Sequence, residues 1–256
     1  YDSHELFTEV PELLSKKKIK LFWMYVESKI IPKLKNVITV SEGYANYYKK
    51  KYGNSIVIIK NVPYLYTEKI NNLSIPGFQF DKKNIIYQGS LNKDRGIDLM
   101  IKSVKLIDVK LFIFGSGDLE FSLREYVIKE NLTNKVFFIG RVPFNDLRNI
   151  TKFFDLGLSF EENSCLSYRY SLPNKVFDYI HAGIPVLSSD LPEISNFIIS
   201  NKVGQTLNSR EPKEIAEQIL ELISNKKRYQ KNIEKTKKAY CWQKEEKKLL
   251  KLFNCF

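Results

Sequence analysis

Residues 84–90 read NIIYQGS, and residues 110–117 read KLFIFGSG. Each run consists mainly of β-branched and aromatic residues and ends at a glycine, which is the pattern of a buried strand followed by a tight turn. The interval between them has the length and amphipathic pattern of a helix. Strands that alternate with amphipathic helices are typical of a parallel sheet with helices on both faces. The predicted fold class is therefore α/β.

The same alternation continues along the chain. Strands are predicted at residues 36–40, 55–59, 84–88, 110–114, 135–139, 155–159, 185–188 and 203–207. Residues 61–80 interrupt the pattern with Pro63 and Gly77 and show no sustained period, which indicates a linker. From Pro212, which suits a first helical position, the pattern is helical to the end of the chain apart from a break near Asn225.

These boundaries predict four parts. They are the end of a first Rossmann-like domain at 1–62, a linker at 63–80, a complete Rossmann-like domain at 81–225 and a basic helix at 226–256. The chain begins at Tyr1 without a Met or a signal-peptide pattern. We therefore expect a fragment that lacks most of its first domain.

Composition excludes several classes of protein. The 43% of hydrophobic residues excludes disorder for most of the 256 residues. The most apolar stretch, Ile19 to Ile31, contains Glu27 and Lys29, so no membrane span is predicted. The three cysteines form no Cys-x-x-Cys, so neither a disulfide framework nor a zinc site is indicated. A protein of the cytoplasm, soluble or peripheral on the membrane, fits best.

The formal charge of +12 is concentrated at the two ends of the chain. Residues 226–256 hold eleven basic and three acidic side chains, residues 1–60 hold eleven and six, and the part between them is close to neutral. Three interpretations are open: a solvated helix face, attraction to an anionic membrane, or binding of nucleic acid. No recognition motif accompanies the charge, so no nucleic-acid partner is expected.

Two glycine-containing loops follow predicted strands, where an open α/β sheet binds its ligands. In the first, Gly89 would let the backbone approach a ligand, and Arg95 could donate to a phosphate. The second contains Gly115 and Gly117 but lacks the third glycine of a dinucleotide-binding motif. A tight turn and a phosphate cradle remain equally compatible with this second loop.

A third loop leads into a predicted helix. Ser171 can cap this helix, and Pro173 then lies in its first turn. Free amide groups at a helix start favour a diphosphate, and Lys175 adds a positive charge. Asp178 lies one turn further on and could accept hydrogen bonds from a ribose. An ordinary capped helix with surface charges is the alternative.

Residues 172–186, LPNKVFDYIHAGIPV, with SDLPE at 189–193, resemble the donor-binding region of family-four glycosyltransferases of the GT-B fold. Shorter pieces agree in order: DSHE at 2–5, VSE at 40–42, NVP at 61–63, RG at 95–96, FGSG at 114–117 and FIGRV at 138–142. The resemblance implies two Rossmann-like domains that face a cleft. The first binds mainly the acceptor, the second binds mainly the nucleotide-sugar, and a C-terminal helix returns to the first.

The resemblance also implies roles for individual residues. Arg95 falls where the family has a basic residue on the donor diphosphate. Ser171 and Leu172 fall where backbone amides meet that diphosphate, with Lys175 close by and with Gly89 and Ser90 in the first loop. Asp178 matches the second acid of the family's Glu-x7-Glu pair, which holds the ribose.

Further roles are implied for the base and the sugar. Arg141 and Val142 match the segment whose main chain meets the base, with Gly115 and Gly117 nearby. His4 resembles the histidine beside the reacting sugar.

Two positions depart from the family pattern. Tyr170 stands where the first acid of the pair is expected, beside the donor sugar, and Glu161 and Glu162 are the nearest upstream carboxylates. Ser90 replaces the basic residue that often follows the first-loop glycine. We therefore expect weaker donor binding or a rearranged loop.

The resemblance implies a retaining glycosyltransferase that uses a UDP- or GDP-type sugar as substrate, without a cofactor. The implied acceptor is a glycan or a lipid-linked glycan in bacterial surface-polysaccharide assembly. No metal is expected, and Asp118-Leu119-Glu120 is interpreted as solvated surface. The alternatives are a nucleotide-sugar epimerase of the same fold, a donor-binding module without activity, or a nucleic-acid-binding module.

Overall fold

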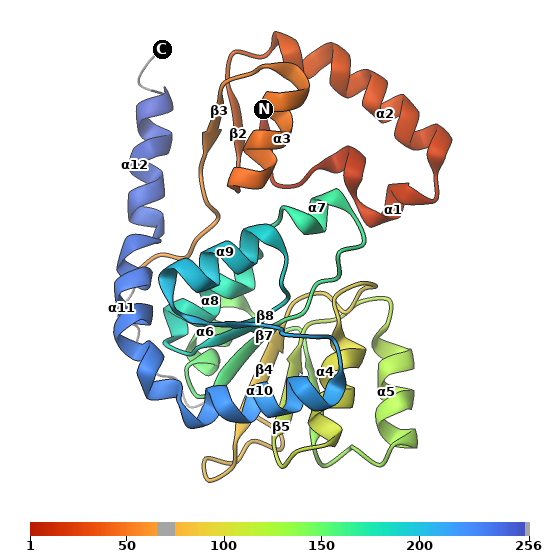
Figure 1. Cartoon of the computed structure of the whole chain (residues 1–256), viewed down its shortest axis with the longest axis vertical. Coiled ribbons are helices and arrows are strands. Elements are labelled where there is room, and N and C mark those ends of the chain that lie inside the picture. Colours follow the sequence, from red (N-terminus) through yellow and green to blue (C-terminus); the bar gives the residue numbers. More distant parts are fainter. Residues whose placement is uncertain (66–74, 254–256) are drawn as a thin grey trace.

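The computed structural model describes residues 1–65 and 75–253. Its strands form two parallel sheets (Figure 1). The first sheet has the strand order β1-β2-β3, with the bounds Asp2–Ser3, Val37–Thr39 and Ile56–Ile58. The second sheet has the order β6-β5-β4-β7-β8-β9. The predicted α/β class with parallel sheets is confirmed.

The second sheet contains the main hydrophobic core. Its strands are β4 (Asn84–Gln88), β5 (Lys110–Phe114), β6 (Val136–Gly140), β7 (Leu156–Ser159), β8 (Val186–Ser188) and β9 (Gly204–Thr206). Every residue of β4, β7 and β8 is buried, because these strands are covered on both faces. This burial explains why apolar residues follow one another in these strands and do not alternate with polar ones.

Helices cover both faces of this sheet. They are α4 (Ile97–Lys105), α5 (Glu120–Lys129), α6 (Phe144–Thr151), α8 (Asn174–Ala182), α9 (Pro192–Asn201) and α10 (Pro212–Ser224). The short helix α7 (Leu166–Arg169) instead contacts η1 (Phe7–Glu9) of the first half. Helices α4 and α10 pack against each other, while α8 packs against β7, β8 and α6. The strand order reverses between β4 and β7, so the loops that follow these two strands diverge and leave room for a ligand.

A smaller set of helices connects the strands of the first sheet. They are η1 (Phe7–Glu9), α1 (Pro11–Leu14), α2 (Lys17–Ile30), η2 (Ile31–Lys33) and α3 (Glu42–Tyr52). Helix α2 has no buried residue and extends away from the rest of the molecule (Figure 1). Within residues 1–65 and 75–253, no helix has both the length and the apolar character needed to cross a bilayer.

The C-terminal helices return to the first sheet. They are η3 (Lys226–Tyr229), α11 (Gln230–Ala239) and α12 (Trp242–Phe253), and α12 runs beside β3 (Figure 1). The Trp242 amide donates to the Pro63 carbonyl over 2.9 Å, and Glu245 accepts from the Lys60 amide over 3.0 Å. The predicted return of the C-terminal helix is therefore seen, with a second break before Trp242 that the sequence pattern missed.

All eight predicted strands are present, each within one residue of its predicted bounds. The prediction missed β1, whose two residues are too few to form a pattern. Part of the predicted linker at 63–80 lies outside the described residues, and Cys255 lies outside them as well.

The two sheets are joined by contacts at the start of α3. The Glu193 carboxylate accepts from the amides of Glu42 and Gly43 over 3.0 and 2.8 Å. The Ser41 hydroxyl accepts from the Tyr44 amide and donates to the Tyr170 carbonyl over 2.7 Å. One side chain from each half of the molecule therefore satisfies the amides of this first helical turn, which have no partner inside the helix.

Candidate functional site

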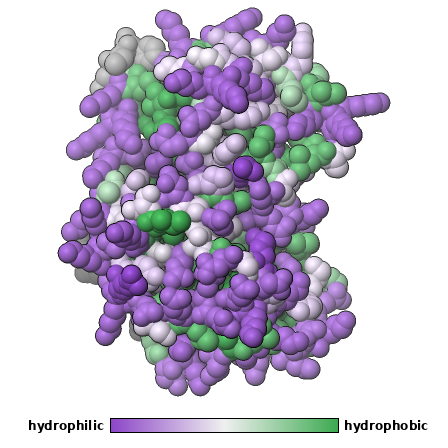
Figure 2. All heavy atoms as spheres, viewed as in Figure 1, coloured by the Kyte–Doolittle hydropathy of each residue, from purple (hydrophilic) through white to green (hydrophobic). Residues whose placement is uncertain are grey.

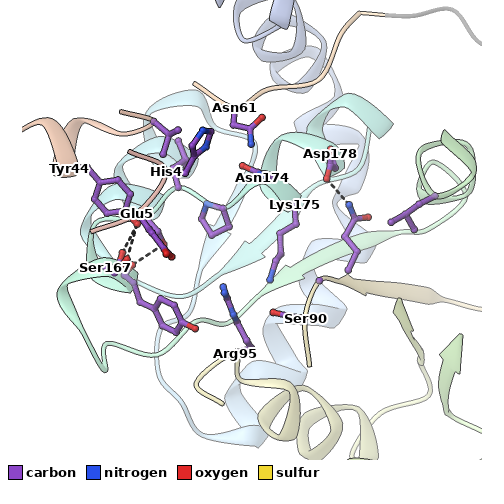
Figure 3. Close-up of a pocket in the computed structure, with 18 residues that line it drawn as sticks. His4, Glu5, Tyr44, Asn61, Ser90, Arg95, Ser167, Asn174, Lys175 and Asp178 are labelled. Atoms are coloured by element: carbon purple, nitrogen blue, oxygen red, sulfur yellow. Dashed lines mark hydrogen bonds between the residues drawn. The ribbon is translucent and has the colours of Figure 1, made fainter. Parts of the chain in front are cut away.

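A cavity of about 420 Å³ lies between the two sheets, at the ends of β4 and β7 (Figure 3). Its walls come from both halves of the chain. The first half contributes His4, Glu5, Val40, Tyr44 and Asn61, and the second contributes Gln88, Gly89, Ser90, Arg95, Leu147, Ser167, Tyr168, Ser171, Leu172, Pro173, Asn174, Lys175 and Asp178. The site therefore lies where the strand order reverses, as expected for an open α/β sheet.

Two cations of the cavity wall converge on one carboxylate behind it. Lys175 Nζ lies 2.7 Å from Glu161 Oε1, and Arg95 lies 3.5 Å from the same oxygen. The second oxygen of Glu161 accepts from the Ser159 hydroxyl over 2.7 Å. Figure 3 shows Arg95 and Lys175 reaching toward each other from opposite sides of the cavity. The structure thus brings together two cations that are 80 residues apart in sequence.

The Glu161 carboxylate is almost completely buried, with 1% of its side chain exposed. Burial alone would raise its pKa, but the charges of Lys175 and Arg95 and the hydrogen bonds from Lys175 and Ser159 lower the pKa to about 2. Aromatic rings border the two cations, since Lys175 Nζ lies 4.4 Å from the ring centre of Tyr87 and Arg95 lies 4.6 Å from that of Tyr168.

The two glycine-containing loops meet at the carboxyl ends of the neighbouring strands β4 and β5. A Cβ on Gly115 would lie 1.8 Å from the Gly89 carbonyl oxygen, and both residues have positive φ angles. A Cβ on Gly89 would lie 3.4 Å from Lys175 Nζ, so a larger side chain here would crowd the lysine ammonium group. The Ser90 carbonyl accepts from the Tyr87 hydroxyl over 2.7 Å, which fixes the first loop. These contacts explain the glycines by close packing.

Helix α8 begins two residues later than predicted. Its first residue is Asn174, and Pro173 is the capping position, without a side-chain cap. The expectation that Ser171 caps this helix is wrong, because its hydroxyl donates to the Tyr168 carbonyl over 3.0 Å. The first turn of α8 still belongs to the cavity wall, since Asn174 and Lys175 both line it, and the first amides of a helix have no partner inside the helix.

Asp178 lies on α8 at the other side of the cavity. Its carboxylate accepts from the Gln88 side-chain amide over 2.8 Å, and the Gln88 carbonyl oxygen accepts from Thr151 over 3.2 Å. Burial raises the pKa of Asp178 to about 6, and the Gln88 hydrogen bond and the charge of Arg148 offset only part of this effect. The remaining oxygen of Asp178 could accept from hydroxyl groups of a ligand.

His4 lines the cavity from the first half of the chain, and its side chain is 60% exposed. Its Nε2 lies 3.1 Å from an Asp2 carboxylate oxygen. Tyr170, expected beside a donor sugar, does not line this cavity, and its place beside a sugar stays a prediction. Its ring instead packs against Gly43, where a Cβ would lie 2.6 Å from the Tyr170 Cβ.

Gly115, Gly117, Arg141 and Val142 were expected near a base. The structure describes all four, and none of them lines this cavity. Arg141 is exposed and donates from Nε to the Ser116 hydroxyl. Gly117 packs against Leu91. The place of Gly115, Gly117, Arg141 and Val142 beside a nucleobase stays a prediction.

Several residues at the site had no role predicted from the sequence, chiefly Gln88, Tyr44, Tyr168 and Glu161. Gln88 is the last residue of a predicted strand, and that position could have marked it as facing the ligand. Tyr44 and Tyr168 reach the cavity only through the folding of distant segments. No metal-binding group of His, Cys, Asp and Glu is found in the part of the chain that the structure describes.

Curated relatives match across most of this chain. A chitobiosyldiphosphodolichol beta-mannosyltransferase of Candida albicans is 26% identical over 231 residues, which cover 81% of this chain and 49% of the relative. A glycosyltransferase of Methanocaldococcus jannaschii is 22% identical over 202 residues, which cover 74% of this chain and 56% of that protein. This chain therefore spans about half the length of the curated relatives it matches.

Solved structures share the fold at low sequence identity. A sucrose-phosphate synthase from Thermosynechococcus elongatus superposes with a TM-score of 0.79 at 16% identity, over 99% of this chain and 66% of that one. Anabaena HepE, solved with UDP and glucose, gives 0.74 at 14% identity over 100% and 71%. These neighbours identify the arrangement of two Rossmann-like units as the GT-B fold. The sequence profile described as Glycosyl transferases group 1 matches residues 68–239. With two thirds of its length matched by that profile, the chain belongs to the group 1 glycosyl transferase family.

Proposed function

We propose that this protein takes part in transferring a sugar from a nucleotide-diphosphate-sugar to a glycan or lipid-linked acceptor. The observation that carries the proposal is the cavity wall in which Arg95, Lys175 and the first turn of α8 converge. A leaving diphosphate gains negative charge as the bond to the sugar breaks. Two cations and free helix amides, already fixed in position, stabilise that charge without further rearrangement.

The remaining residues fit the other parts of such a substrate. Asp178 would accept hydrogen bonds from the ribose hydroxyls, since one of its oxygens is already held by Gln88. His4 lines the same cavity from the acceptor side and would lie beside the reacting sugar. A nucleotide-sugar is a substrate in this scheme, and no cofactor or metal is required.

The donor is proposed to be of the UDP or GDP type. In support, one structural neighbour was solved with UDP and glucose, and one relative is named as a beta-mannosyltransferase. A role in bacterial surface-polysaccharide assembly is proposed from neighbours that include WaaG, a glycosyltransferase of lipopolysaccharide biosynthesis. Retention of the anomeric configuration rests on the family resemblance.

Calorimetric titration with UDP, GDP and ADP, each beside its monophosphate, tests the proposal. We expect saturable binding of one diphosphate. Arg95→Ala should weaken diphosphate affinity on the order of tenfold or more and affect the monophosphate less, because a charge-assisted bond to the second phosphate is lost.

Arg124→Ala is the matched control, because Arg124 pairs with Glu120 on the surface of α5. No binding of any diphosphate, or equal losses for the diphosphate and the monophosphate, would contradict the proposal. An epimerase would change the sugar of its nucleotide-sugar without an acceptor. A nucleic-acid-binding module would retain an oligonucleotide in preference to all these nucleotides.

We also propose that the protein works at the cytoplasmic face of an anionic membrane. In support, α2 exposes Leu21, Phe22 and Tyr25 beside Lys18 and Lys29, and hydrophobic residues show on the surface over α2 at the upper right of Figure 2. Basic residues and exposed aromatic side chains are typical of a helix that lies on a membrane surface. Co-sedimentation with lipid vesicles tests this proposal. A bound fraction that depends neither on the content of anionic lipid nor on the salt concentration would contradict it.

A further inference from the structure

Glu161 stands directly behind the two cations of the cavity and does not line the cavity itself. Its Oε1 contacts both Lys175 and Arg95, and its Oε2 accepts from Ser159. Both oxygens therefore already have partners inside the protein. A ligand in the cavity would meet the cations and would not meet this carboxylate.

The two cations need such a partner. Only 9% of the Lys175 side chain and 25% of the Arg95 side chain are exposed, so both charges are partly removed from water. Two like charges close together in a low-dielectric site repel each other, and burial further disfavours the charged form of a lysine. The neutral rings of Tyr87 and Tyr168 are the other groups against these cations. Rings of this kind provide attraction but no full charge.

We propose that Glu161 is a positioning residue, which keeps Lys175 protonated and holds Lys175 and Arg95 together where a diphosphate binds. The proposal rests on the proposed function for the identity of the ligand, but not for the charge of the lysine. The group of three keeps a net charge of +1, so the site still attracts an anion.

This role differs from that of the acid expected at Tyr170. That acid would contact the donor sugar, whereas Glu161 is buried and reaches the substrate only through the cations. Glu161 therefore does not replace the missing acid. It instead compensates for the absence of a basic residue at Ser90, because it fixes the two cations that remain.

The first test measures the charge of Lys175 without any nucleotide. Acetic anhydride acetylates only uncharged amines, and mass spectrometry of peptides gives the rate at Lys175 relative to exposed Lys93. In Glu161→Gln we expect Lys175 to become reactive at a pH at least one unit lower than in the wild type, which is about a tenfold higher rate at the same pH. An unchanged pH profile would overturn the proposal, whether or not a nucleotide binds.

Glu162→Gln is the matched control, since it makes the same chemical change one residue away. Glu162 is half exposed and pairs with Arg210 on the surface over 3.4 Å. We expect its Lys175 profile to equal that of the wild type. An equal shift in both variants would contradict a specific role of Glu161.

The second test measures diphosphate affinity against pH. The ratio of the affinity of Glu161→Gln to that of the wild type should fall as the pH rises, because Lys175 in the variant loses its proton. Comparing the two proteins at each pH cancels the titration of the nucleotide and of Asp178. A ratio that does not change with pH would contradict the proposal, while a wild type that binds no diphosphate would contradict only the proposed function.

A further variant guards against loss of folding. Glu161→Asp keeps the charge and shortens the side chain by one methylene, so it should fold even where Glu161→Gln does not. We expect Lys175 to keep its wild-type labelling profile in this variant, with diphosphate affinity reduced on the order of tenfold and monophosphate affinity reduced less. Wild-type affinity for the diphosphate would show that the position of the carboxylate does not matter.

Discussion

Two carboxylates lie at the cavity, Glu161 in the loop that follows β7, behind the two cations, and Asp178 on α8. Glu161 contacts two cations and a hydroxyl, and its pKa is lowered to about 2 despite its burial. Asp178 receives one hydrogen bond from the neutral Gln88 amide, and burial raises its pKa to about 6. The protein therefore pairs the charge of Glu161 almost fully and compensates the charge of Asp178 only in part.

This difference separates a structural role from a binding role. A buried charge that is fully paired within the protein is costly to unpair and has little left to offer a ligand. A charge that is desolvated and only partly paired costs stability, and a ligand with hydroxyl donors can supply the missing bonds. The contrast assigns Glu161 to support of the site and Asp178 to contact with the substrate.

The largest effect is expected for Lys175→Met, which removes one partner of the buried pair. Glu161 would keep only Arg95 and Ser159, so the free energy of unfolding should fall on the order of 3 kcal/mol. Urea denaturation measures this loss. Adding Glu161→Gln should restore most of the stability without restoring diphosphate binding.

The control for this prediction is Arg210→Met, which breaks the exposed ion pair with Glu162. Exposed pairs contribute about 0 to 1 kcal/mol, so this variant should be close to the wild type in stability. Equal losses in the two variants would show that the Glu161 cluster is no more important than a surface pair.

A smaller effect of opposite sign is expected for Asp178→Asn. The folded protein retains the Asp178 proton up to about pH 6, whereas the unfolded chain releases it near the ordinary pKa of 3.8. Stability therefore falls as the pH rises between these values. Asparagine removes this cost and can still accept from Gln88, so the variant should be more stable than the wild type on the order of 2 kcal/mol at neutral pH.

Thermal or urea denaturation at several pH values tests this sign. The gain of Asp178→Asn should shrink toward zero near pH 4, and nucleotide binding should weaken at neutral pH. A variant that is less stable than the wild type at neutral pH would break the contrast between the two carboxylates.

The smallest effect is expected at a third carboxylate, Glu193, which caps α3 from the other half of the molecule. Glu193→Ala leaves the amides of Glu42 and Gly43 to water and should cost about 1 kcal/mol of unfolding free energy. Glu193→Gln retains one acceptor oxygen and should lie between. Equal stability of all three proteins in urea would show that this cap adds nothing to the fold.

Sequence patterns predicted the second sheet well because its central strands are buried on both faces. Apolar runs such as residues 85–87 and 111–114 leave little ambiguity about the place of these strands. The two-residue strand β1 could not be predicted, because its pairing with Ile38 and Thr39 depends on a chain segment more than 30 residues away.

Site residues that belong to a sequence motif could be predicted, whereas residues that reach the site only through tertiary contacts could not. Arg95, Lys175 and Asp178 were named in advance and all line one cavity. Glu161 was seen only as a nearby acid, because its partners come from β7, from the loop before α4 and from α8. The cap role of Ser171 was misassigned because a serine two residues before a proline also fits a turn, and here its hydroxyl donates back to the Tyr168 carbonyl.

The exposure of α2 also determines how copies of this chain behave toward one another. Leu21, Phe22 and Tyr25 are more than half exposed, and contiguous apolar surface of this kind favours self-association. The lysines among them repel the same surface on a second copy. Salt shortens the range of that repulsion to about 10 Å at 0.1 M, so concentrated solutions should become less colloidally stable as salt is added.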